Sequence, residues 1–223
     1  MPKLFVYRIV TDNNVAPHVA NNYLTLTLCK PGIRKAAKAG DYVLALVALQ
    51  HAKLTGKGPD RYFKAAYLFK IDEVVPLKAY TSWCETHAPD KICSLDQFEG
   101  NCQYDELGQQ TVPWPHPPAY KEKDLSGKFS LTSKFFAAWT STSPYTLSSE
   151  ELKQIGLDEE QIKTATRNYF TSPLSKEQQA ALDDIIKGAQ PQVNKPAVRT
   201  TIRKSCSKKG GSMLRRSIRR RRM

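Results

Sequence analysis

The sequence predicts an α+β domain followed by a basic tail, and three observations support this prediction. Apolar runs rich in β-branched and aromatic residues, typical of strands, recur up to residue 145. After Pro144, helical periodicity and helix-capping residues replace them. Residues 195–223 hold twelve of the 34 Lys and Arg side chains and no Asp or Glu, which leaves 22 basic and 21 acidic residues elsewhere. We therefore expect a mainly β domain at 1–145, a helical extension at 146–190 and a disordered basic tail at 191–223.

The strands are predicted from apolar content and from alternation. The opening strand ends at the turn formers of 11–14, and the segment that starts at Tyr23 alternates apolar and polar side chains. The longest apolar run begins at Tyr42 and indicates a buried strand, which a basic, Gly-rich connection at 50–61 separates from the next apolar run. Strands are expected at 4–10, 23–28, 42–49, 62–75 and 129–139.

The first helix is predicted between two of these strands. Pro31 suits the first turn of a helix over 32–39, because its fixed φ is helical and its missing N–H would have no partner there. Gly40 ends this helix. Residues 76–128 show little regular pattern, so we expect a long surface excursion that aromatic contacts around Trp114 tie down.

Three further helices are predicted in the C-terminal part from their capping residues. Ser148 or Ser149 can cap a helix over 149–155. The other two begin with capping-box patterns, in which a residue at the helix start is followed three positions later by Gln. These pairs are Asp158 with Gln161 for a helix over 159–170, and Ser175 with Gln178 for a helix over 176–187.

The first motif with chemical content joins the second and third strands. It runs Cys29-Lys30-Pro31-x-Ile33-Arg34-Lys35-x-Ala37-x-x-Gly40-Asp41-Tyr42-Val43. A basic helical turn of this kind presents backbone donors beside Lys30 and Arg34, which would suit a phosphate group. The alternative is a solvated basic face whose glycine only ends the helix.

This motif, together with Tyr7, Asp12, Ala16-Pro17 and the pair Asn101-x-x-Tyr104, resembles the family called nucleotide modification associated domain 2. The resemblance spans about residues 3–145. It covers the Leu-x-x-Tyr-x-x-x-x-Asp start, the Cys-Lys-Pro-x-Ile-Arg helix and the Gly-Asp strand. The chain departs from the family pattern at Gly100, where the family more often has Asp, and at 46–49, where the family tends to be Gly-rich.

The resemblance implies a small PUA-like β-barrel with flanking helices and a link to viral and bacterial systems that handle modified nucleotides. Domains of that type hold a base in an aromatic-lined pocket and grip the nucleic-acid backbone with basic residues. The resemblance therefore places nucleic-acid contacts at Lys30, Arg34, Lys35, Asp41, Asn101 and Tyr104. The aromatic residues considered for a base pocket are Tyr7, Tyr42, Trp83, Tyr104, Trp114 and Trp139, most of which must be core.

Two other constellations contain metal-binding or nucleophilic residue types. Cys84, His87, Cys93 and Cys102 supply four zinc ligand types, but only the first two are closely spaced, so ordinary thiols are the favoured interpretation and neither a metal nor a cofactor is predicted. Catalytic ingredients also exist, since Cys29 next to Lys30 at a helix start would have increased nucleophilicity, although a cysteine packed at the end of a strand is the favoured interpretation. Its possible companions are His18, Asp12 and Asp41. We predict no reaction from these residues alone.

The basic tail predicts contact with a polyanion. Its arginines would bind phosphates through counterion release, without base preference and with strong salt dependence. Because no aromatic residue follows Phe170, the tail cannot stack on bases, and any selectivity must come from the body. The densest group of arginines is Arg215, Arg216, Arg219, Arg220, Arg221 and Arg222.

Composition also bounds the cellular setting. No stretch approaches the roughly 18 uninterrupted apolar residues of a membrane span, and we see no secretory signal at the N-terminus. The five cysteines form no framework, so a reducing intracellular compartment is expected, with the nucleus or a virion left open by the basic tail.

The sequence alone is compatible with three functions. The leading hypothesis is a nucleic-acid-binding protein whose body binds a nucleotide feature while its tail contacts DNA or RNA phosphates. The second is a virion or other structural protein whose tail meets packaged nucleic acid, a capsid protein or another acidic partner. The third is an enzyme or accessory factor of nucleotide modification with Cys29, Lys30 or Asp41 at its site.

Overall fold

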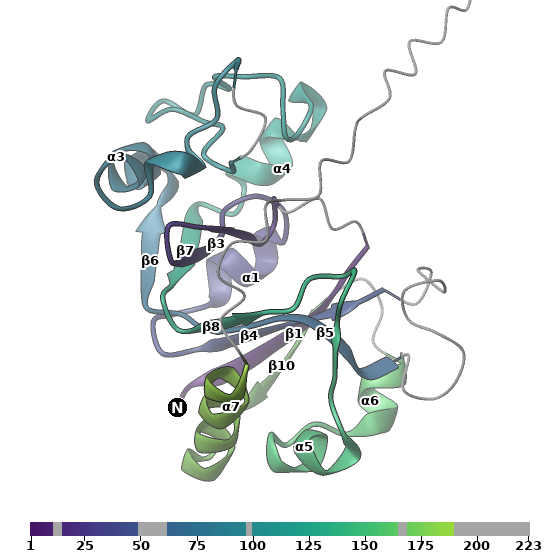
Figure 1. Cartoon of the computed structure of the whole chain (residues 1–223). Helices are drawn as coiled ribbons and strands as arrows, with labels where there is room; N and C mark the ends of the chain where they lie inside the picture. Colours follow the sequence, from purple (N-terminus) through teal and green to yellow (C-terminus); the bar gives the residue numbers. More distant parts are fainter. Residues whose placement is uncertain (11–14, 49–61, 97–99, 165–168, 190–223) are drawn as a thin grey trace, which may run out of the picture.

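Strands and helices are mixed throughout the protein, which confirms the α+β class (Figure 1). The computed structural model describes residues 1–10, 15–48, 62–96, 100–164 and 169–189. The predicted tail at 191–223, with its six clustered arginines, lies outside the described residues. Within the described part of the chain, no helix is both long and apolar enough to cross a membrane.

The larger of two sheets has six strands in the order β10-β1-β4-β5-β8, with β9 also paired to β5. Its central strands β1 and β4 run parallel, with Leu4 opposite Tyr42, and every other pair in this sheet is antiparallel. The strands are β1 (Lys3–Ile9), β4 (Tyr42–Val47), β5 (Lys64–Lys70), β8 (Phe136–Ala138), β9 (Tyr145–Thr146) and β10 (Phe170–Pro173).

The smaller sheet has four antiparallel strands in the order β2-β3-β7-β6. These are β2 (His18–Ala20), β3 (Tyr23–Leu26), β6 (Glu73–Pro76) and β7 (Phe129–Ser133). Neither sheet closes on itself among the described residues, so the PUA-like barrel that the resemblance implied is not confirmed. The chain instead crosses from the larger sheet to the smaller between β5 and β6, and it returns between β7 and β8.

The helices lie at both faces of the larger sheet (Figure 1). Helices α5 (Ser149–Gln154), α6 (Glu159–Thr164) and α7 (Lys176–Gly188) lie on one side. On the other side are α1 (Pro31–Ala36) and the smaller sheet, followed by α3 (Leu77–His87) and α4 (Lys121–Leu125). Short 3-10 turns occur at Pro89–Lys91 (η2) and Pro118–Tyr120 (η3).

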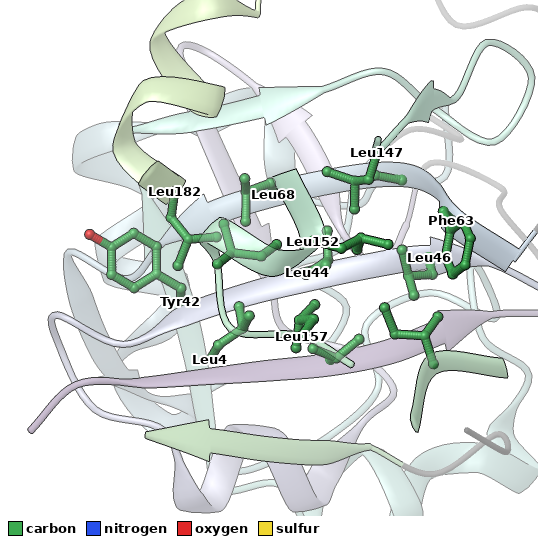
Figure 2. Packing of buried hydrophobic residues seen from close by; sticks show 14 of the residues in the cluster. Leu4, Tyr42, Leu44, Leu46, Phe63, Leu68, Leu147, Leu152, Leu157 and Leu182 are labelled. Carbon is green, nitrogen blue, oxygen red and sulfur yellow. The ribbon is translucent and has the colours of Figure 1, made fainter. Parts of the chain in front are cut away.

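Strand β4 is buried on both faces, which explains its uninterrupted apolar sequence. Because successive side chains point to opposite faces, Leu44 packs toward α5–α7 together with Leu182, as Figure 2 shows. Val43 packs toward α1 and the smaller sheet, against Leu24 and Leu131. The larger sheet therefore separates two hydrophobic cores.

The C-terminal helices form as their caps predict. The side chains of Ser148 and Ser175 accept hydrogen bonds from the backbone of Glu151 and Gln178, and both capping boxes are complete. In α6, the N–H of Gln161 donates to Asp158 at 2.9 Å. The predicted extent of that helix to residue 170 is wrong at its end, because Phe170 begins β10, which pairs with β1.

Other element predictions are wrong at turns and in the excursion. The predicted strand 62–75 divides into β5 and β6, since Ile71 turns away to exchange backbone hydrogen bonds with Gly40 and Asp41. The predicted strand 129–139 likewise divides into β7 and β8. The excursion at 76–128 contains α3, which buries Tyr80, Trp83 and Cys84 at helical spacing but has no side-chain cap to announce it. Strand β2 was also unpredicted.

Candidate active site

The segment between β3 and α1 is a strained turn that carries Cys29. Both Cys29 (φ 58°) and Lys30 (φ 42°) adopt the left-handed backbone conformation, which costs roughly 1–2 kcal/mol for a residue with a Cβ. Two hydrogen bonds hold the turn: the Cys29 N–H donates to Asp124 Oδ1 at 3.0 Å, and Arg34 Nε donates to the Cys29 carbonyl at 2.8 Å. Strained non-glycine residues of this kind cluster at functional sites.

Two side chains from the long excursion meet the sulfur of Cys29. His116 Nε2 lies 3.4 Å from Cys29 Sγ, and the opposite ring nitrogen, Nδ1, lies 2.7 Å from Asp124 Oδ2. The Tyr104 hydroxyl donates to the same carboxylate oxygen at 3.1 Å. Sulfur, imidazole and carboxylate thus stand in the order of a nucleophile, its acid–base partner and the group that orients the imidazole.

The charges of this triad reinforce one another. Burial opposes protonation of His116, but its contacts with Asp124 and Cys29 outweigh burial and raise the pKa of His116 to about 9. Burial likewise opposes ionisation of Asp124, yet the hydrogen bonds from His116, from the Cys29 backbone and from Tyr104 hold the pKa of Asp124 below its ordinary value. His116 is therefore an imidazolium at neutral pH, paired with a carboxylate on one side and facing the Cys29 sulfur on the other.

A pair of glutamine side chains fixes the backbone of His116. Gln103 is fully buried; its Oε1 accepts from the His116 N–H at 3.1 Å, and its Nε2 donates to the His116 carbonyl at 2.5 Å. Gln110 Nε2 donates to the same carbonyl at 2.8 Å. Because both backbone groups of His116 are held, its ring is positioned by the excursion rather than by packing alone.

Arg34, predicted to contact nucleic acid, is instead part of the scaffold of the site. Its side chain is fully buried and donates to the carbonyls of Cys29, Phe129 and Asp124. Burial lowers the pKa of Arg34 to about 10, which leaves the guanidinium charged at neutral pH. No room remains beside it, since a Cβ on Gly127 would lie 2.2 Å from Arg34 Cζ. This placement does not support contact with a phosphate from solvent.

The rim of the site is cationic and aromatic. Tyr120 is 45% exposed, its ring centroid lies 5.4 Å from that of His116, and Lys123 Nζ lies 5.8 Å from the Tyr120 ring centroid. Lys30 is half-buried, with Nζ 3.1 Å from the Arg8 carbonyl and 4.5 Å from the Tyr7 ring centroid. Burial, together with repulsion from Lys123, lowers the pKa of Lys30.

The other predicted contact residues of the body are dispersed. Asp41 is buried and accepts the backbone N–H groups of Lys3 and Lys38, each at 2.8 Å. Asn101 is fully buried and accepts from the Tyr80 hydroxyl at 2.9 Å, which joins α3 to the smaller sheet. Lys35 is exposed on α1. Tyr104 alone among them contacts the triad, through its hydrogen bond to Asp124.

The aromatic residues considered for a base pocket do not converge either. Four of the six are buried, and Trp114 and Trp139 are half-buried. The buried four are Tyr7, Tyr42, Trp83 and Tyr104.

The considered zinc ligands are not assembled in the described residues. His87 stacks on Trp83 at 5.0 Å and its Nδ1 lies 2.9 Å from the Trp83 carbonyl, while Cys84, Cys93 and Cys102 are buried. The described cysteines are free thiols.

Among the described residues, Cys29, His116 and Asp124 form a group in which one potential metal-ligand atom of each lies within 4.8 Å of the others. Sulfur, imidazole nitrogen and carboxylate oxygen are a chemically suitable set for zinc. Cys29 and Asp124 face opposite nitrogens of the imidazole, however. One ion bound by all three would therefore replace both hydrogen bonds of the triad.

The residues that meet Cys29 differ from the companions that its sequence suggested. Of the companions considered for Cys29, His18 is buried and lies 3.2 Å from Lys91 Nζ, Asp41 caps backbone groups, and Asp12 lies outside the described residues. His116 and Asp124 are 87 and 95 residues away from Cys29 in the chain. The only sequence signal that points to them is the functional character expected of a long irregular excursion.

Comparison with known proteins gives one match. The family model described as nucleotide modification associated domain 2 matches residues 1–196. The match therefore extends beyond residue 145 and includes β10 and all three C-terminal helices. No curated protein and no solved structure matches the chain.

Proposed function

The chain belongs to the nucleotide modification associated domain 2 family, and from this premise we propose that it is a thiol-dependent enzyme of nucleotide modification with Cys29 as nucleophile. The observation that carries the proposal is the continuous relay from Cys29 Sγ to His116 Nε2 and from His116 Nδ1 to Asp124 Oδ2. The strained turn at Cys29 supports it, because strain of this kind presents a side chain to a substrate.

Each residue of the triad has a defined task in this proposal. The reacting form of Cys29 is the thiolate, whose sulfur donates an electron pair to an electrophilic carbon, and the electron pair of the bond that breaks moves to the departing atom. His116 Nε2 gives its proton to that atom and afterwards removes a proton from the water or acceptor that cleaves the carbon–sulfur bond. Asp124 positions the imidazole and stabilises its charged form, and Tyr104 positions Asp124.

The rim favours a phosphorylated, aromatic substrate. Tyr120 offers an exposed ring on which a base can stack, next to the charged ring of His116. Lys123 and Lys30 add two cations at the same rim, where a phosphate would relieve their mutual repulsion. A nucleotide meets both requirements, which agrees with the family.

Site-resolved alkylation tests the proposal without a known substrate. We expect iodoacetamide to modify Cys29 at pH 7 at least about tenfold faster than Cys206, which serves as a reference thiol within the same chain. His116→Gln should remove this excess. The matched control is His87→Gln, since His87 packs against Trp83 away from the triad and its replacement should leave the rate unchanged.

Two results would contradict the proposal. Equal alkylation of Cys29 and Cys206 would show that the triad does not activate the sulfur. Protection of Cys29 by micromolar Zn²⁺, lost equally in His116→Gln and Asp124→Asn, would instead identify the three residues as metal ligands.

A second candidate function, nucleic-acid binding through the tail, is favoured by the charge distribution of the chain. Twelve basic and no acidic residues in 195–223 fit contact with phosphates. In the body, Lys35 remains exposed for such contact. This function is compatible with the first, because a tail of this kind would hold the enzyme near its substrate.

Binding of the full chain to single- and double-stranded DNA and RNA across a salt series tests this second function. Engagement of six phosphates predicts a log–log salt slope of about −5. Replacing the six arginines at 215, 216 and 219–222 by glutamine should flatten that slope. An unchanged slope would exclude the arginines as the contact. A preference among the four ligands that survives the replacement would place selectivity in the body.

A further inference from the structure

A groove of about 990 Å³ lies between α7, α5 and the segment that carries Trp139 and Tyr145. It shares no residue with the Cys29 site. Its apolar part is made by Ile185 and Ala181 of α7 and by the rings of Trp139 and Tyr145, which stack with centroids 4.9 Å apart at 18°. The groove ends at Gly188 and Ala189, where the described chain also ends.

The polar part of the groove is acidic. Glu151, Glu177 and Asp184 line it, and no Lys or Arg is among its lining residues. Glu151 accepts from the Tyr145 hydroxyl at 2.5 Å, and although burial opposes ionisation, this bond and those from Ser148 hold the pKa of Glu151 below its ordinary value. Glu151 is therefore a carboxylate at neutral pH, beside an aromatic pair.

Carboxylates next to a stacked aromatic pair are suited to a guanidinium group. A guanidinium stacks flat on an aromatic ring while its N–H groups bond carboxylate oxygens in two directions. A lysine ammonium, which has no flat face, would use only the charge. A polyanion is excluded as occupant by the sign of the groove.

The described chain ends at the groove, and the sequence that follows contains an arginine-rich segment. Ala189 lines the groove, and the residues that follow, 190–223, contain no acidic side chain. Twenty-five residues separate Ala189 from Arg215, a contour length of roughly 80–90 Å that suffices for a return to the groove. From Arg215 to Arg222, six of eight residues are arginine, and Ile218 supplies an apolar side chain for the part of the groove around Ile185.

We propose that the arginine-rich segment Arg215–Arg222 docks in the groove lined by Glu177, Asp184 and the Trp139–Tyr145 pair. Because the same arginines are the chain's strongest means of holding phosphates, docking competes with nucleic-acid binding. The groove thereby competes with nucleic acid for these arginines. Nucleic acid in excess displaces the segment from the groove. Covalent attachment makes the docking effective although each exposed ion pair is weak.

The indole N–H resonance of Trp139 in the full chain is the direct test. Of the three tryptophans, Trp139 is assigned by loss of its signal in Trp139→Phe. We expect its chemical shift to differ between the wild-type chain and the chain with glutamine at all six arginines of 215–222, at low salt. The difference should vanish in the Glu177→Gln/Asp184→Asn background and in 0.5 M salt.

Two outcomes of this measurement would overturn the proposal. Identical Trp139 shifts with and without the six arginines would show that the segment does not occupy the groove. The measurement is repeated at protein concentrations from roughly 20 to 500 μM, the range of weak association. A chemical-shift difference that grows with concentration would show that a second copy supplies the segment.

Nucleic-acid affinity supplies an independent measurement with a matched control. Glu177→Gln/Asp184→Asn should strengthen binding of the full chain to a 20-nucleotide single-stranded DNA at 50 mM salt by roughly two- to thirtyfold. The control, Glu85→Gln/Glu106→Gln, changes the net charge equally at exposed positions outside the groove. Equal strengthening by both pairs would reduce the effect to net charge and overturn the competition.

Discussion

Asp124 connects the turn that carries Cys29 to the ring of His116, and its replacement by asparagine tests the relay most directly. The variant preserves the size of the side chain, and its amide oxygen can still accept the Cys29 N–H that Asp124 Oδ1 now accepts at 3.0 Å. It removes the negative charge that lies 2.7 Å from His116 Nδ1. The substitution therefore isolates the electrostatic part of the relay.

The expected effect follows from the protonation of His116. Its pKa of about 9, against an ordinary value of 6.5, corresponds to about 3 kcal/mol of preferential stabilisation of the imidazolium. Burial lowers that pKa and only the contact with Cys29 would remain to raise it, so without the carboxylate we expect the titration midpoint of His116 to fall toward its ordinary value. A complete fall to about 6.5 would lower the imidazolium fraction at pH 7 from about 99% to roughly 25%.

NMR titration of the His116 ring protons between pH 5 and 10 measures the shift of the His116 midpoint directly, because this range includes the wild-type midpoint of about 9. The alkylation rate of Cys29 at pH 7 should decrease in parallel. Asp183→Asn is the matched control, because Asp183 also accepts a tyrosine hydroxyl, that of Tyr42 at 2.6 Å, but lies on α7 and pairs with Lys70 rather than with the triad. A His116 midpoint that stays near 9 in Asp124→Asn would refute the relay.

Three further predictions concern the scaffold of the site. Arg34→Met leaves three carbonyls without their buried donor and should lower the free energy of unfolding, measured by urea titration, by about 3 kcal/mol or more. Its control is Lys35→Met at the adjacent exposed position, which should change the free energy of unfolding by less than about 0.5 kcal/mol. Gly127→Ala forces a Cβ against the Arg34 guanidinium and should lower the free energy of unfolding by roughly 1–3 kcal/mol. The control is Gly188→Ala, where a Cβ meets open space, and equal urea midpoints for the two variants would contradict the close packing at Gly127. The folded-state pKa of His116 is raised, so its stabilisation is complete below pH 6.5 and lost as the pH rises through about 9. The wild type should therefore lose up to about 3 kcal/mol relative to His116→Gln between pH 7 and 10, and parallel stability curves would contradict this.

Local sequence patterns predicted several of the strands and the C-terminal helices. Alternation and apolar runs identify β1, β3 and β4 because each side chain's exposure repeats with the pleat. Capping residues identify α5 and α7 because the bonds involved span only three residues. The Cys-Lys-Pro motif placed Cys29 at the start of α1 for the same reason, because adjacent residues encode where a helix begins.

Tertiary structure alone decided what Cys29 faces and what Arg34 does. A motif rich in basic residues looks the same in sequence whether its arginine points to solvent or inward. Only the folded chain shows Arg34 buried under Gly127 and bonded to three carbonyls. His116 and Asp124 come to Cys29 across 87 and 95 residues of irregular chain, and such contacts carry no periodicity. Sequence by itself therefore determined the α+β class, the charge partition and the motif that contains Cys29. The residues that Cys29 faces depended on how residues 76–128 pack, which long-range contacts decide.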